Sequence, residues 1–92
     1  MSSLQTNNPV LKCLVVDYES FAIEGIINHI KKLNFLEVVD TCSSAIEARE
    51  VLRQKEVDLM FLDINMPDLS GLEFLESLEQ PPLTIFTTAY SE

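Results

Sequence analysis

Residues 61–71 read FLDINMPDLSG, and this stretch decides how the rest of the chain is interpreted. A run of apolar residues ends at Asp63, and Pro67 and Gly71 follow shortly after it. Burying an unpaired carboxylate is costly, so Asp63 must find partners, reach solvent or take part in chemistry. The stretch therefore predicts a buried strand with a functional acid at its carboxyl end.

The composition is that of one small folded domain with an acidic surface. The chain has 92 residues, 47% of them hydrophobic, which is enough for a real core. Its formal net charge is −9, from fifteen acidic and six basic residues. This balance disfavours direct contact with nucleic acid, which selects basic surfaces. It favours a module that binds a cation or docks on a basic partner.

Localisation signals are missing from the sequence. The longest apolar runs are too short to span a membrane, and the polar start MSSLQTNNPV lacks the layout of a signal peptide. We therefore expect a cytoplasmic protein in which residues 1–9 form a flexible leader. Cys13 and Cys42 match no metal or redox spacing, so reduced core thiols are expected. His29 is expected to be a solvated helix residue.

Strand and helix patterns alternate along the chain. Four short apolar stretches, 10–16, 35–42, 57–62 and 83–88, are typical of buried strands. The first helical pattern begins at Ser20 and keeps apolar residues on one face as far as Leu33. The pairs Ser44 with Glu47 and Ser70 with Glu73 predict capping boxes for the next two helices, and the third helix carries apolar residues at Leu72, Leu75 and Leu78.

This alternation predicts an α/β fold with a doubly wound parallel sheet and right-handed crossovers. Such sheets bind ligands beyond the carboxyl ends of their strands. Asp17, Asp63 and Thr88 stand at three of those ends. In a sheet of order 2-1-3-4 these strands are neighbours, so the two carboxylates and the hydroxyl are expected to converge on one pocket.

Three pieces of sequence resemble the receiver domain of response regulators in two-component signalling: CLVVDYES (13–20), MFLDINMPDLSGLEFL (60–75) and IFTTAY (85–90). The resemblance extends over roughly residues 11–91 and implies a flavodoxin-like sheet. AIEGI (22–26) and IFTTAY are also similar to receivers that precede LytTR-type DNA-binding domains.

The resemblance implies that a histidine kinase phosphorylates Asp63 and thereby switches an output domain, with DNA-binding transcription regulation expected in the full-length protein. Thr88 would be the switch hydroxyl, whereas Thr87 is expected to face the opposite way. The loop would be shaped by Met66, Pro67 and Gly71. Pro67 restricts the backbone, and Gly71 permits a close approach or an unusual backbone angle.

The resemblance also implies a Mg²⁺ site formed by Asp17, Asp63 and the backbone carbonyl of Asn65. Receivers carry two adjacent acids after their first strand, but here Tyr18 follows Asp17. Glu19 is a candidate replacement, one residue further on. With fewer acidic ligands, we expect weak Mg²⁺ binding.

A second departure lies beyond strand 83–88. Receivers place a lysine at the end of a fifth strand, and this chain is expected to be incomplete at its carboxyl end, lacking the fifth strand and the last two helices. Residues 10–92 would then form a partial receiver domain. An apolar strand edge left open by that loss predicts a homodimer through residues 83–88.

Two other function classes are compatible with parts of the pattern. Hydrolases of the haloacid dehalogenase type also use an aspartate after a strand, but they need a second aspartate where this chain has Asn65. A pseudo-receiver that is never phosphorylated and acts as an interaction or dimerisation module is the stronger alternative, because of Tyr18 and the missing lysine. We expect a signalling module rather than an enzyme.

Overall fold

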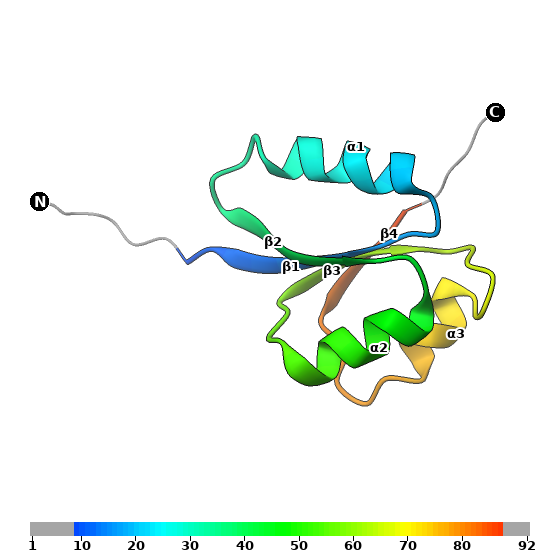
Figure 1. Cartoon of the computed structure of the whole chain (residues 1–92). Helices are drawn as coiled ribbons and strands as arrows, with labels where there is room; N and C mark the ends of the chain where they lie inside the picture. Colours follow the sequence, from blue (N-terminus) through cyan, green and yellow to red (C-terminus); the bar gives the residue numbers. More distant parts are fainter. Residues whose placement is uncertain (1–8, 88–92) are drawn as a thin grey trace, which may run out of the picture.

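A computed structural model describes residues 9–87, and the chain alternates strands and helices throughout (Figure 1). In chain order the elements are β1 (Leu11–Val16), α1 (Ser20–Ile30), β2 (Leu36–Cys42), α2 (Ala45–Gln54), β3 (Leu59–Asp63), α3 (Gly71–Glu76) and β4 (Leu83–Thr87). The four strands form one sheet of order β2-β1-β3-β4, and all neighbouring pairs are parallel. The predicted topology is therefore confirmed.

The sheet is covered on both faces, as a parallel sheet requires. Figure 1 shows α1 on one side and α2 with α3 on the other. On the α1 side, the core contains Cys13, Val15, Ile30 and Leu59. On the other side it contains a larger group, namely Leu14, Val16, Cys42, Ala45, Ala48, Met60, Leu62, Met66 and Phe74. Successive residues of β1 and β3 thus point to opposite layers.

The expected helix starts are confirmed at α3 and only partly at α2. At α3 the Ser70 hydroxyl accepts a hydrogen bond from the Glu73 amide, and the Glu73 carboxylate accepts one from the Ser70 amide, which completes a capping box. At α2 the Ser44 hydroxyl caps the Glu47 amide, but the Glu47 carboxylate bonds the amide of Ser43 instead.

Two expected apolar faces are wrong in detail. α1 ends at Ile30, and Leu33 lies in the turn beyond it with 41% of its surface exposed. In α3, Leu72 is 54% exposed and Phe74 is fully buried. The helix has only six residues, so the bulky ring of Phe74 settles which face meets the sheet. Leu75 and Leu78 pack against the core from its margin.

The bounds of β1, β2 and β3 differ from the predicted ones by one or two residues, whereas β4 begins at Leu83 as predicted. The largest difference is at β3, which begins at Leu59 rather than at Val57. The Asp58 carboxylate accepts a hydrogen bond from the Lys12 amide at 2.8 Å. Asp58 therefore joins the end of the sheet through its side chain. The predicted leader lies outside the described residues except for its last residue, and so does Thr88.

Both thiols are buried and free, as predicted. Burial raises the pKa of both, that of Cys42 to about 12. Such thiols stay protonated at neutral pH and are poor nucleophiles, so they serve as core residues. Among residues 9–87, no helix is long and apolar enough to cross a membrane.

Candidate functional site

Two carboxylates meet at the carboxyl-end edge of the sheet. Asp17 directly follows β1, and Asp63 is the last residue of β3. These strands are neighbours, with Val16 paired to Leu62, so the next residue of each strand lies beside the other. Only 5% of Asp17 and 6% of Asp63 is exposed, and they are the only buried charged residues in the described part of the chain.

The environment of Asp17 disfavours its charged form. Burial raises the pKa of Asp17, and the neighbouring negative charge of Asp63 raises it further. The Glu19 amide donates a hydrogen bond to Asp17 Oδ1 at 3.0 Å, which opposes this rise only in part. The three ion pairs formed by the described residues all lie elsewhere. The carboxylate pair is therefore short of positive charge, which is the condition in which a bound cation is favourable.

Backbone hydrogen bonds hold the loop that follows Asp63. The Asn65 amide donates to Asp63 Oδ1 at 3.1 Å, the Ile64 amide donates to the Thr87 carbonyl at 3.2 Å, and the Gly71 amide donates to the Ile64 carbonyl at 2.7 Å. These bonds fix the loop against β4 and against the first turn of α3.

The loop also anchors to the core through one of its side chains. Met66 is buried in the larger core group, whereas Pro67 and Asn65 are exposed. Of the residues expected to shape the loop, Met66 therefore does so by packing and Pro67 by restricting its own backbone.

Gly71 is required by close approach. A Cβ built at this position would collide with the carbonyl oxygen of Asp63 and would lie 3.0 Å from Ile64 Cα. No glycine among the described residues has a positive φ, so the special backbone angle considered from sequence is absent. The start of α3 thus rests directly on the backbone of the acidic residue.

Sequence reasoning missed Asp68. Its two carboxylate oxygens accept hydrogen bonds from the amides of Ala45 (3.3 Å) and Ile46 (3.2 Å), the first two residues of α2. An acid at a helix amino terminus satisfies free amides and interacts favourably with the helix dipole. In the sequence Asp68 is recognisable only as an acid in a loop, because its partner Ile46 lies 22 residues away.

Of the two threonines considered from the sequence, Thr87 lies beside Asp63 in the sheet. In the β3–β4 ladder Thr87 is paired with Asp63, so both side chains point to the same face of the sheet. The Thr87 Oγ1 atom is buried and has no hydrogen-bond partner among the described residues. The expectation that Thr87 faces away from the site was therefore wrong. Thr88 lies outside the described residues.

Neither side chain of the two residues after Asp17 adds a carboxylate to the pair, although the Glu19 amide bonds Asp17. Tyr18 is 58% exposed, and Glu19 is an exposed residue at the amino end of α1. In residues 9–87, no group of three or more acidic, histidine or cysteine side chains is close enough to hold a metal. The structure therefore does not bring the Glu19 carboxylate into the site.

The donor set nevertheless suits Mg²⁺. This ion prefers oxygen ligands, keeps several waters and is commonly held by one or two carboxylates. Asp17 and Asp63 supply two buried carboxylates with an unmet need for positive charge, and the Asn65 carbonyl is a further candidate oxygen. The residues present therefore fit the ion, and they supply two acidic ligands, Asp17 and Asp63.

Asp17→Asn should stabilise the metal-free protein at neutral pH. Because the folded-state pKa of Asp17 is raised, the ionised side chain costs folding free energy that asparagine avoids. The Asn oxygen can still accept the Glu19 amide bond. We expect the free energy of unfolding to rise by about 0.5–2 kcal/mol at pH 7, measured by urea denaturation in chelator.

The gain should depend on pH with a defined sign. It is largest above the folded-state pKa of Asp17 and disappears as pH falls toward the unfolded value, where the wild-type carboxyl is protonated in both states. Asp40→Asn is a control of opposite sign, because bonds from the Thr41 amide and Lys55 lower the pKa of Asp40. A stability loss in Asp17→Asn at pH 7 would show that the ionised carboxylate of Asp17 beside Asp63 does not cost folding free energy.

Comparisons with known proteins agree with this geometry. The Escherichia coli transcriptional regulatory protein BtsR is 36% identical over 85 residues, which cover 90% of this chain and 36% of BtsR. An uncharacterized response regulatory protein of Vibrio cholerae is 38% identical, with the same shares covered. The chain thus spans about a third of the length of these relatives.

A solved structure has the same arrangement of strands and helices. The response regulator domain of Thermotoga maritima CheB superposes with a TM-score of 0.78 at 28% identity, covering 86% of this chain and 60% of that one. The response regulator receiver domain family matches residues 13–92. With the buried carboxylate pair at the carboxyl edge of a 2-1-3-4 sheet, this match shows that the chain belongs to the response regulator receiver domain family of two-component signalling.

Proposed function

We propose that this chain accepts a phosphoryl group on Asp63 from a histidine kinase and thereby switches an output domain. The observation that carries the proposal is the position of Asp63, a buried carboxylate at the end of β3 beside the carboxylate of Asp17. The name of the relative BtsR, a transcriptional regulatory protein, supports DNA-binding transcription regulation as the output of the longer protein. With a net charge of −9, this segment itself would not contact DNA.

The transfer is a displacement at phosphorus. An Asp63 carboxylate oxygen attacks the phosphoryl phosphorus, and the bond between phosphorus and the kinase histidine nitrogen breaks. The imidazole keeps the electron pair of that bond and gains a proton, and Asp63 becomes an aspartyl phosphate. A carboxylate is a competent nucleophile when its repulsion with the incoming phosphate is reduced.

Asp17, Asp63 and the Asn65 carbonyl would hold Mg²⁺ in this reaction. When bound, the ion would neutralise charge on the carboxylates and on the phosphoryl oxygens. The Thr87 hydroxyl, buried and unpaired among the described residues, is a candidate donor to the phosphoryl group beside the predicted Thr88. Because Tyr18 supplies no carboxylate, we expect weak Mg²⁺ binding.

Phosphorylation can be tested on the 92-residue chain with acetyl phosphate and Mg²⁺, read by intact mass. We expect slow addition of one phosphoryl group, with acetate as the leaving group. Asp63→Asn should abolish the addition. Tyr18→Asp should lower the Mg²⁺ concentration needed for half-maximal labelling about tenfold, because a carboxylate near the site adds a charged ligand.

Asp40→Asn is the matched control, since it removes an acid that lies away from the site and pairs with Lys55. Labelling that persists in Asp63→Asn would refute the assigned residue. No labelling in the wild type or in Tyr18→Asp at saturating Mg²⁺ would instead favour a second candidate function.

That candidate is an interaction module that is never phosphorylated. It is favoured by the exposed Tyr18 in the place of an acid and by the apolar surface of β4. β4 is the edge strand of the described sheet, and exposed fractions reach 71% for Leu83, 48% for Ile85 and 38% for Phe86. An open apolar edge invites pairing with a second copy.

We therefore expect the chain to form a two-fold homodimer through β4, with or without phosphorylation. Ile85→Lys should return it to a monomer, because a charge on this edge would be buried between two copies. Light scattering at micromolar concentrations measures the mass. Ile46→Lys is the matched control, because Ile46 is 72% exposed and lies on α2 rather than on β4. A wild-type monomer, or an Ile85→Lys dimer, would contradict the expectation.

A further inference from the structure

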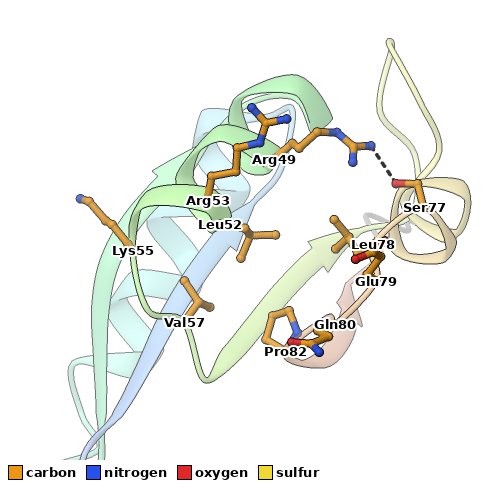
Figure 2. A pocket seen from close by; sticks show the side chains of 10 residues that line it. All are labelled: Arg49, Leu52, Arg53, Lys55, Val57, Ser77, Leu78, Glu79, Gln80 and Pro82. Atoms are coloured by element: carbon orange, nitrogen blue, oxygen red, sulfur yellow. Dashed lines mark hydrogen bonds between the residues drawn. The ribbon is translucent and has the colours of Figure 1, made fainter.

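A cavity of about 560 Å³ lies between α2 and the connection from α3 to β4 (Figure 2). It is lined by two stretches of chain that fall within residues 49–57 and 77–82. Val57 precedes β3 and Pro82 precedes β4, so the cavity lies at the amino-end edge of the sheet, opposite to Asp63. It is therefore separate from the carboxylate site, and its size is within the range of small-molecule pockets.

The cavity concentrates positive charge on an acidic protein. Its lining includes Arg49, Arg53 and Lys55, which are three of the six basic residues in the chain. Glu79 is the single carboxylate in the same lining. On a chain with a net charge of −9, such a local excess of cations stands out from the rest of the surface.

The three cations differ in how far they are already paired. The Lys55 ammonium bonds the Asp40 carboxylate at 3.2 Å and extends away from the cavity centre (Figure 2). Arg53 has an exposed ion pair with Glu50 at 3.7 Å, a type of contact that is weak in water. Arg49 has no carboxylate within 4 Å among the described residues.

Arg49 is nevertheless held in place by neutral groups. Its Nη2 atom donates to Ser77 Oγ at 2.7 Å, and its guanidinium lies over the Phe74 ring at 5.5 Å from the centroid. Ser77 Oγ in turn donates to the Phe74 carbonyl at 2.6 Å, so the hydroxyl is fixed as an acceptor. A guanidinium has five N–H donors, and this contact uses one nitrogen. The group is thus preorganised and its charge is still unpaired.

The rest of the cavity lining combines four apolar side chains with the polar residues Ser77, Glu79 and Gln80. Leu52 and Val57 come from the α2 side, and Leu78 and Pro82 come from the α3–β4 connection; Figure 2 shows Leu52 and Leu78 facing each other across the space. Arg49 and Arg53 are four residues apart on α2 and so share one helix face. A guanidinium pair beside these apolar side chains matches a ligand with an anionic head and an apolar body.

We propose that this cavity binds a small organic anion, with a carboxylate or phosphate held by Arg49 and Arg53 and an apolar body packed between Leu52 and Leu78. Guanidinium groups bind both kinds of anion through paired hydrogen bonds. The ligand would link α2 to the α3–β4 connection, and β4 ends beside the loop of Asp63.

Amide chemical shifts of the ¹⁵N-labelled 92-residue protein can test this, with benzoate and phenyl phosphate as probes and chelator present. We expect saturable shifts at residues 49–57 and 77–82 with at least one probe, and no such shifts with neutral benzamide. Arg49→Gln should weaken binding about tenfold, because a charged hydrogen-bond donor is lost. Arg53→Gln, at an exposed position, should weaken it in the same direction.

Lys32→Gln is the matched control, because it changes the net charge equally on an exposed residue beyond α1. It should leave binding unchanged. The proposal would be overturned by an absence of shifts with both anions, by shifts confined to residues 63–66, by equal shifts with benzamide, or by equal weakening in Lys32→Gln. The choice between benzoate and phenyl phosphate would identify the preferred head group.

Discussion

Gly71→Ala should lower the free energy of unfolding by about 3 kcal/mol and the melting temperature by on the order of 10–20 °C. The added methyl group would collide with the Asp63 carbonyl oxygen and would press on Ile64 Cα at 3.0 Å. Both obstacles are backbone atoms, so a side-chain rotation cannot relieve the contact. The usual gain of alanine over glycine in a helix, about 1 kcal/mol, is too small to offset it. Thermal unfolding followed by circular dichroism measures the change.

Gly25→Ala is the matched control in the same protein. Gly25 lies inside α1, and a Cβ there meets nothing within 4 Å. The substitution should therefore stabilise the protein by about 0.5–1 kcal/mol. Opposite signs at the two glycines would establish close approach as the reason for Gly71, whereas a near wild-type melting temperature for Gly71→Ala would contradict it.

Phe74→Ala should cost still more, about 3–5 kcal/mol, because it removes the largest fully buried side chain among residues 9–87. The ring fills the core between α3 and the sheet, and its face also supports the Arg49 guanidinium. Urea denaturation should show a lower midpoint. If the alanine variant does not fold, Phe74→Leu should lower the same midpoint by about 1–2 kcal/mol.

Phe21→Ala is the matched control, because it removes a phenylalanine ring from the surface instead of from the core. Phe21 is 75% exposed on α1, so its loss should change the free energy of unfolding by less than about 0.5 kcal/mol. Similar costs for the two alanine variants would mean that α3 does not pack as described.

The topology was predictable because it rests on local patterns. Short β-branched runs alternate with helical segments, and this alternation leaves few arrangements other than a parallel sheet. The meeting of Asp17 and Asp63 was predictable for the same reason, since both stand where neighbouring strands end. The family motif then specified which acid is expected to accept the phosphoryl group.

The remaining features depend on contacts between distant residues or on fine orientation. Leu72 and Phe74 are equally apolar in the sequence, and only the approach angle of a short helix decides that the ring is buried. Asp68 looks like a solvated loop acid until α2 is placed beside it. The position of Thr87 beside Asp63 follows from the ladder register, which the strand pattern alone does not fix.

The hydrogen bonds of the loop after Asp63 limit how its length can change. Residues 64–70 are fastened to β4 at Ile64, to the start of α3 at Gly71 and to the start of α2 through Asp68. One inserted residue would break at least one of these attachments and leave helix amides uncapped. By contrast, the turn between α1 and β2 is exposed over residues 31–35. Added residues, tags or reporter segments are therefore best placed in that turn.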